Sequence, residues 1–521
     1  MTIPWLTILA LLPAVGALVL IFTGAKGAKQ LALVFSLLTF AFALVIASRF
    51  RIGGGMQLVE QVPWIKPLGA YYALGLDGLG LTLVLLVVII TPVVIIASWR
   101  DFDGVGVSAE PIDGRAATIA PKYDARVFFA LILAVQSCAL FLFLATDVFL
   151  FYVFFEVILV PMYFLIGGFG PGPRRTYAAA KFLIFGLLGG FVMLASVIGL
   201  YVQSAKVGAP SYLLSTLSQL DIATGTGRWL FVGFMFAFAI KAPLVPLHTW
   251  LPDAAEESTP GSATMMVGVM DKIGTFGMIR FCLGLFPEAS QWATPVVLVL
   301  ATISILYGAI LAIGSRDIMR FVAYTSISHF GFIVLGIFAF TSQSLTGSTL
   351  YMLNHGMSTA ALFVMAGYLI KRRGSRDINA YGGVDQVAPV LAGLLLFAGL
   401  STLSLPGLSS FVSEFMVLAG TFGRHPAYAA ISTLAIVLAA LYILIMYQRT
   451  MTGPVAPEVR EKVTEINGRE RLAMAPLVLL ILALGFFPKP LLSIIEPSTQ
   501  ATMQHVGVTD PQPRVSAEGG R

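Results

Sequence analysis

Long hydrophobic segments recur along the whole chain and are separated by short polar stretches. Segments 79–97, 229–245 and 391–405 are almost continuously apolar, with no alternation of apolar and polar residues. A strand that crosses a membrane needs about 10 alternating residues, whereas a helix needs about 20 apolar ones. The pattern therefore predicts an all-α protein whose helices cross a membrane.

The predicted spans number roughly fourteen when each has the length of a membrane-crossing helix. They cover residues 3–22, 30–48, 76–98, 127–145, 147–169, 178–203, 229–250, 260–286, 293–314, 320–340, 346–370, 390–421, 428–448 and 472–495. We expect the first span to be a retained helix, since no basic residue precedes it and no cleavage site is evident.

Two of these spans contain residues that interrupt a helix. Pro243 and Pro246 lie in the seventh span, and Pro406 with Gly407 lies in the twelfth. Proline removes a backbone donor and clashes with the preceding turn, so both helices should break there. Broken helices are tolerated in a membrane only where protein or a water-filled cavity meets the freed backbone. Such paired breaks are typical of transport proteins with internal repeats.

The positions of the breaks suggest how the chain is organised. Spans four to eight can form one five-helix unit and spans nine to thirteen a second, with the broken helix fourth in each. An odd number of spans per unit makes the repeat inverted. We therefore expect four segments: three N-terminal helices, two inverted five-helix repeats, and a last helix with the tail, over 1–125, 126–290, 291–452 and 453–521.

Composition supports a membrane protein and excludes several classes of function. Of the 521 residues, 58% are hydrophobic and 11% are charged, against about 25% charged in a soluble protein. This excludes a soluble enzyme and a disordered chain. The net charge of +6 lacks the dense basic stripe of a nucleic-acid-binding protein. No phosphate-binding glycine loop is present in the sequence. Cys138 and Cys282 lie in apolar segments and are interpreted as core residues.

The distribution of basic residues predicts the orientation. Loops after odd-numbered spans hold 19 Lys and Arg residues, and those after even-numbered spans, with the tail, hold 10. Basic loops stay in the cytoplasm. We therefore expect a multi-pass membrane protein with both termini outside the cytoplasm.

The most informative residues are titratable ones near the middle of the spans, because a residue ten positions from a helix end lies about 15 Å deep. Six such residues lie on six different helices: Glu156, Lys241, Lys272, His329, His355 and Glu414. An isolated charge at that depth costs at least about 2.5 kcal/mol, so these groups should face one another along a hydrated path. Structural pairing of a single group is the alternative reading, and Lys181 and Arg280 lie nearer helix ends, where they can snorkel.

This set of residues suits proton transfer better than transport of a bulky solute. A Glu–Lys contact at 4 Å is worth about 4 kcal/mol at an effective dielectric near 20. Making or breaking such a contact can switch a lysine between holding and releasing a proton. Glu156 with Lys241 is the candidate switch pair. Lys272, His329 and His355 would carry the proton laterally to Glu414.

Four phrases around these residues are similar to one known family. They are 241–254 (KAPLVPLHTWLPDA), 324–331 (YTSISHFG), 354–356 (NHG) and 406–415 (PGLSSFVSEF). They resemble the seventh-, tenth-, eleventh- and twelfth-helix signatures of the antiporter-like subunits of respiratory complex I (NADH:quinone oxidoreductase). The resemblance covers about residues 125–425. The same family includes subunits of cation/proton antiporters and of energy-converting hydrogenases.

Two features favour an M-type chain of complex I. Glu414 stands where L- and N-type relatives usually carry lysine, and the chain stops soon after the fourteenth span. The resemblance implies a proton path through Glu156, Lys241, Lys272 and Glu414, with His248, His329 and His355 as family histidines. It also implies L- and N-type neighbours in the membrane arm. No cofactor is implied on this chain, because NADH, FMN, the iron–sulfur clusters and quinone would be bound by partner subunits.

The sequence departs from the family pattern at two places. Ala255 stands where a second loop histidine is usual, so that histidine's role cannot be carried over. Asp271 precedes Lys272 where an apolar residue is usual. It can either face a partner on a neighbouring helix or alter the central relay. Two other functions remain open, namely a subunit of a sodium/proton antiporter and a structural scaffold; a solute carrier fits less well.

Overall fold

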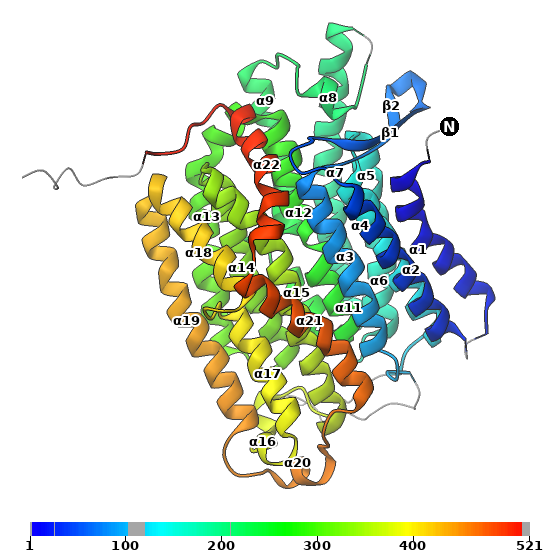
Figure 1. The fold of residues 1–521 in the computed structure, drawn as a ribbon, viewed down its shortest axis with the longest axis vertical. Helices are drawn as coiled ribbons and strands as arrows, with labels where there is room; N and C mark the ends of the chain where they lie inside the picture. Colours follow the sequence, from blue (N-terminus) through cyan, green and yellow to red (C-terminus); the bar gives the residue numbers. More distant parts are fainter. Residues whose placement is uncertain (1–2, 25–26, 103–119, 209, 513–521) are drawn as a thin grey trace, which may run out of the picture.

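The computed structural model describes residues 3–24, 27–102, 120–208 and 210–512 as a bundle of long helices (Figure 1). Within this part of the chain, ten helical segments are long and apolar enough to cross a membrane. They are α1 (Trp5–Phe22), α2 (Ala28–Arg49), α3 (Gly78–Ala97), α4 (Ala125–Leu144), α5 with α6 (Val148–Phe169), α7 (Arg175–Val207), α13 (Pro287–Gly314), α14 (Ile318–Phe338), α15 (Ser342–Arg373) and α19 (Pro426–Met451). The fold is therefore all-α in its membrane part, as predicted.

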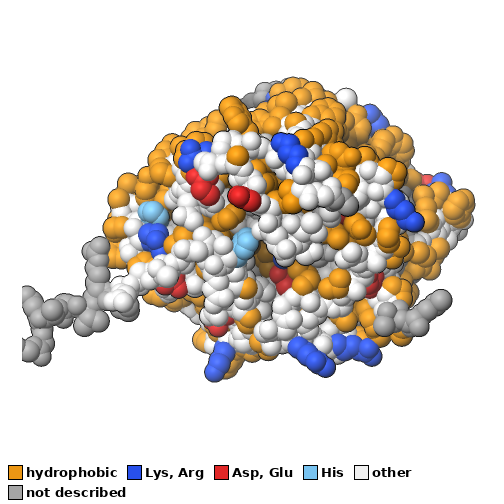
Figure 2. Space-filling model, turned by 90° about the horizontal axis from the view of Figure 1, so that it is seen from above, with side chains coloured by type: hydrophobic (Ala, Val, Ile, Leu, Met, Phe, Trp, Pro, Cys, Tyr) orange, Lys and Arg blue, Asp and Glu red, His pale blue; other side chains and the backbone are white. Residues whose placement is uncertain are grey.

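The outer surface of the bundle is apolar. Seen from one end, hydrophobic side chains form much of the rim, while charged side chains are scattered over the end face and along its lower edge (Figure 2). Ile184 and Phe191 of α7 and Val437 of α19 are each more than 60% exposed. Large apolar side chains on the outside are expected where lipid is the solvent.

The predicted breaks in the seventh and twelfth spans are confirmed. Helix α9 (Thr224–Lys241) ends at Lys241, and α10 (Trp250–Glu256) begins only after the proline-containing segment. In the same way, α17 (Pro389–Thr402) is separated from α18 (Ser409–Arg424) by Pro406 and by Gly407, whose φ is +93°. Glycine adopts that left-handed conformation without a steric penalty.

Nearby side chains satisfy the backbone groups that the first break exposes. The indole N–H of Trp250 donates to the carbonyl oxygen of Ile240 at 3.0 Å. The backbone N–H of Val245 donates to Ser304 Oγ at 2.9 Å. The break is thus held by protein contacts, as a non-helical segment inside a membrane requires.

The eighth predicted span is continuous but irregular. It comprises α11 (Pro260–Met265), the π-helix η2 (Met266–Met270), α12 (Lys272–Gly277) and a second π-helix, η3 (Met278–Leu283). Spans seven, eight and twelve therefore contain no single regular apolar helix of membrane length, and the total of fourteen remains a prediction.

The last predicted span is bent. Residues 472–495 do not form one straight helix: α21 (Gly468–Phe486) and α22 (Lys489–Val506) meet at an angle of 72°. Pro488 and Pro490 are the cause, because proline cannot continue a helix past the preceding turn. Helix α22 then packs against α3 and α15.

The segment between the second and third predicted spans contains a hairpin, which the hydrophobic pattern did not predict. Strands β1 (Gln57–Ile65) and β2 (Ala70–Leu76) pair antiparallel around the short helix η1 (Lys66–Leu68). The Glu60 carboxylate accepts the backbone N–H groups of Leu6 and Thr7 and so holds the hairpin against the start of α1.

The remaining short elements lie at the two ends of the bundle. Helix α8 (Leu214–Leu217) is at the same end as the hairpin, and α16 (Val384–Val387) and α20 (Pro457–Lys462) are at the opposite end (Figure 1). The turn η4 (Ile378–Ala380) follows α15.

The Trp250–Ile240 contact can be tested by mutation. Trp250→Phe leaves the buried Ile240 carbonyl without its donor, which costs about 1–3 kcal/mol. We expect this variant to unfold at a lower temperature than the parent protein in detergent. Trp229→Phe is the matched control, because Trp229 lies on α9 and is 79% exposed. Equal unfolding temperatures for the two variants would contradict this role of Trp250.

Candidate functional site

Most of the predicted site residues lie inside the bundle. Lys241, Lys272, His248, His329, His355 and Glu414 are each at most 5% exposed. Glu156 of α5 (Val148–Val157) is half-buried, but both of its carboxylate oxygens are covered. Six of these residues, all but His248, lie on six helices that are distant in sequence, namely α5, α9, α12, α14, α15 and α18. These six residues are called the polar layer below.

Glu156 and Lys241 interact electrostatically without a direct hydrogen bond. Each feels the charge of the other, yet neither the Glu156 oxygens nor Lys241 Nζ has a hydrogen-bond partner. Lys241 Nζ instead lies 4.8 Å from the ring centre of Phe155. A Cβ atom at Gly190 of α7 would overlap the Glu156 carboxylate, so this glycine makes room for it. The expected switch pair is therefore open in this structure.

The central lysine is fully paired. Lys272 Nζ donates to the Val267 carbonyl oxygen at 2.7 Å and lies 2.8 Å from His355 Nδ1. The Val267 carbonyl belongs to η2, one of the π-helices that flank α12. Irregular turns of this kind often occur at functional sites.

A chain of contacts continues from His355 toward Glu414. The rings of His355 and His329 are 5.4 Å apart, and neither Nε2 atom has a hydrogen-bond partner. His329 Nδ1 lies 2.7 Å from Tyr351 Oη, and Tyr351 donates its hydroxyl hydrogen to Glu414 Oε2 at 2.7 Å. Four of the predicted residues are thus brought together in the order Lys272, His355, His329, Glu414.

Sequence reasoning missed two members of this chain. Tyr351 lies four residues before His355 on α15 and therefore on the same helix face. That spacing was an available signal. Ser404 donates to Glu414 Oε2 at 2.5 Å from the break before α18, and only the structure could reveal this contact.

The other candidates lie outside the chain of contacts. His248 sits in the break before α10, 5.2 Å from the ring of Tyr307, and its Nδ1 atom has no partner. Lys181 of α7 pairs with Asp253 at 2.7 Å. Arg280 pairs with Asp77, which caps the start of α3. The pairing of Lys181 and Arg280 fits a structural role.

The two residues that depart from the family pattern are both fully buried. Ala255 is packed within α10. Asp271 lies between η2 and α12, and neither of its carboxylate oxygens has a hydrogen-bond partner. Cys138 and Cys282 are buried and free, as expected for core residues.

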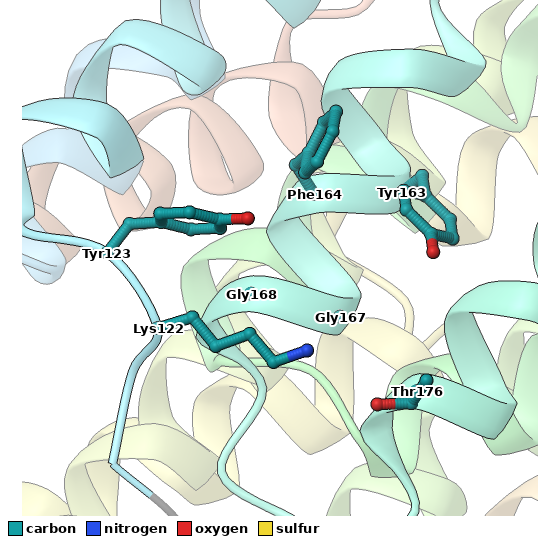
Figure 3. A pocket seen from close by; sticks show the side chains of 7 residues that line it. All are labelled: Lys122, Tyr123, Tyr163, Phe164, Gly167, Gly168 and Thr176. Atoms are coloured by element: carbon teal, nitrogen blue, oxygen red, sulfur yellow. The ribbon is translucent and has the colours of Figure 1, made fainter.

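A small cavity lies away from the polar layer. It has a volume of about 90 Å³ and is lined by side chains of the segment before α4 and of the facing ends of α6 (Leu159–Phe169) and α7, among them Lys122, Tyr163 and Thr176 (Figure 3). The cavity contains none of the predicted site residues. Across the described residues, no group of three or more His, Cys, Asp or Glu side chains is arranged to hold a metal ion.

Comparisons with known proteins agree with the resemblance found in the sequence. Residues 145–443 match the family model described as NADH:quinone oxidoreductase/Mrp antiporter, TM. NADH-quinone oxidoreductase subunit M of Mycobacterium tuberculosis is 49% identical over 99% of this chain and 96% of its own length. Subunit M of Escherichia coli is 33% identical over 94% of this chain and 96% of its own length.

The fold is also similar to solved structures. A chain of respiratory complex I from Thermus thermophilus with bound NADH matches with a TM-score of 0.86 at 32% identity, over 96% of this chain and 100% of that one. A chain of the Mrp complex from Dietzia matches in fold with a TM-score of 0.82 at 21% identity, over 97% and 100%. The chain belongs to the family of NADH:quinone oxidoreductase and Mrp antiporter transmembrane subunits.

Proposed function

We propose that this chain is the proton-translocating M-type subunit of a bacterial NADH:quinone oxidoreductase in the plasma (inner) membrane. The observation that carries the proposal is the buried chain of contacts from Lys272 to Glu414. The 49% identity to a subunit M over nearly the whole chain supports the same assignment.

The hydrogen bonds give this chain of contacts a direction. Tyr351 donates to Glu414, so its oxygen accepts the Nδ1 hydrogen of His329 and leaves His329 Nε2 as an acceptor. A charged Lys272 donates to His355 Nδ1, so the hydrogen of a neutral His355 is on Nε2. An unpaired donor and an unpaired acceptor are therefore available on two adjacent rings.

In this arrangement a proton can pass from Lys272 to Glu414. Lys272 releases a proton to His355 Nδ1, and the His355 Nε2 hydrogen moves to His329. The Nδ1 hydrogen of His329 then moves to the Tyr351 oxygen, while the Tyr351 hydroxyl hydrogen moves to the carboxylate of Glu414. His355, His329 and Tyr351 each gain one proton and give one up, so the net change is one proton moved from Lys272 to Glu414.

Glu156 and Lys241 act before this chain as the switch. Both groups are unpaired in this structure. Bringing them into contact stabilises the charged lysine, and separating them favours its release of a proton. A signal from the rest of the complex that moves α5 relative to α9 would therefore set the proton affinity of Lys241.

We further infer that the redox chemistry takes place on other subunits. NADH, FMN, the iron–sulfur clusters and quinone would be bound by partner chains, and L- and N-type subunits would flank this one in the membrane. The family description, which covers complex I and Mrp subunits, supports an assembly of several membrane chains.

We infer an arrangement of fourteen spans with two inverted five-helix repeats. The N-cap residues of the fifth and tenth predicted spans, Asp147 and Asp317, support this arrangement. Each side chain accepts backbone N–H groups at the start of its helix. Each residue also forms a β-bridge to the segment that follows the next span, at Leu213 and Asp377 respectively. Corresponding positions in the two units thus make the same contacts.

The inferred orientation has both termini outside. It can be tested by labelling single cysteines with a maleimide that cannot cross membranes, because both native cysteines are buried. Glu288→Cys, in the loop after the eighth span, should react in right-side-out vesicles. Lys122→Cys, in the loop after the third span, should react only after the membrane is permeabilised. The reverse pattern would invert the topology.

The principal alternative is a subunit of a multi-subunit cation/proton antiporter, which the family description also includes. A scaffold whose charges only hold helices together is another. An antiporter would move cations without NADH oxidation, and a scaffold would lose assembly when a buried charge is removed. NADH-driven acidification itself tests the first alternative, and assembly of the following variants tests the second.

Lys241→Ala removes the lysine of the switch pair. We expect the complex to assemble, and NADH-driven acidification by membrane vesicles to fall about tenfold or more, since proton transfer by a positioned group contributes at least that much. Lys206→Ala, at an exposed lysine, is the control. Normal acidification by an assembled Lys241→Ala complex would refute the switch, whereas loss of assembly would favour a scaffold.

Tyr351→Phe removes the hydroxyl between His329 and Glu414 and keeps the ring. We expect assembly to be retained and the acidification rate per complex to fall about tenfold or more. Tyr368→Phe is a matched control, because Tyr368 is buried on the same helix and its hydroxyl has no hydrogen-bond partner. If both variants pump equally well, the path does not run through Tyr351.

A further inference from the structure

Asp271 is a buried acid with no partner that would explain its presence. Its side chain is 0% exposed, and both carboxylate oxygens lack a hydrogen-bond partner. Asp271 stands at the N-cap position of α12, but its side chain caps no backbone N–H there. Burying such a group without compensation is costly. Neither capping nor a hydrogen-bonded ion pair accounts for it.

The geometry of α12 places Asp271 on the helix face that packs against the end of α9. Gly274 follows Asp271 by three residues and therefore lies on the same face. A Cβ atom at Gly274 would lie 2.6 Å from both the Ala242 nitrogen and the Phe238 carbonyl oxygen. The two backbones are thus in direct contact beside Lys241, the last residue of α9.

Lys272 lies about 100° around the helix from Asp271 and points to a different neighbour. Its Nζ atom contacts His355 of α15. The charged groups that act on Asp271 are Lys272 on its own helix and Lys241 on α9. Asp271 is therefore subject to the charges of both lysines, and no hydrogen bond joins Lys241 to the rest of the layer.

We propose that Asp271 is a proton carrier that links Lys241 to Lys272. The proposal rests on the proposed function and adds a residue to its path. Charged Lys241 gives a proton to the Asp271 carboxylate, which breaks an N–H bond and forms an O–H bond. Asp271 then gives that proton to the neutral amine of Lys272, which breaks the O–H bond and forms an N–H bond. Asp271 returns to the carboxylate, and one proton has moved between the two lysines.

Two substitutions test this role in the assembled complex. Asp271→Asn keeps the shape of the side chain but cannot carry the proton, and Asp271→Leu places an apolar residue of similar size in an apolar setting. We expect both variants to assemble and their NADH-driven acidification per complex to fall at least about tenfold. Asp271→Glu should restore acidification with a shifted pH profile. Cys282→Ala, at a fully buried site in the same span, is the control.

Each outcome decides the proposal. Acidification at the parent rate in either the Asn or the Leu variant would overturn it, and failure of both to assemble would make Asp271 a structural residue. Lys241→Ala, measured in parallel, keeps the two proposals separate. If Lys241→Ala abolishes acidification while Asp271→Asn does not, only the role of Asp271 is lost. If Lys241→Ala also pumps normally, the proposed path fails as a whole.

Discussion

The high cost of leaving a polar group unpaired away from water determines the interior of this protein. An unsatisfied backbone or side-chain group there costs several kcal/mol, so each helix break needs protein contacts that replace the missing hydrogen bonds. The Trp250 indole supplies one to the end of α9. The second break does more, because its Ser404 hydroxyl donates to Glu414. The breaks therefore add polar groups to the interior, beside the side chains that regular helices such as α14 and α15 already place there.

Small residues determine which polar groups can approach one another. Glu156 fits against α7 because residue 190 has no side chain. Gly274 allows the backbones of α12 and α9 to touch, which brings Asp271 toward Lys241. In both places the glycine allows close approach and carries no chemistry of its own. A charged layer made from helices far apart in sequence depends on such close packing.

Prediction from the sequence was most successful where a single residue determines the local backbone conformation or its depth in the bundle. Proline positions predicted both broken helices, and the depth of Lys272 and Glu414 predicted that they are buried. It failed where the outcome depends on neighbours in space. The hairpin over Gln57–Leu76 is fixed partly by Glu60 contacts to α1, and the contacts of Tyr351 depend on how α14, α15 and α18 pack. Pro488 and Pro490 indicate the bend between α21 and α22. The prediction did not use them, because it assigned residues 472–495 to one uninterrupted span.

The polar layer is divided into a connected half and an open half. From Lys272 to Glu414 the groups are hydrogen-bonded except at the junction of the two histidine rings. Glu156, Lys241 and Asp271 have no hydrogen bonds between them. An ion pair made at 4 Å with an effective dielectric near 20 is worth about 4 kcal/mol, so small helix movements in the open half change its energy steeply. The proposed control of proton movement therefore depends on contacts that form and break in the open half, whereas the proposed transfer from Lys272 to Glu414 uses contacts that are already made.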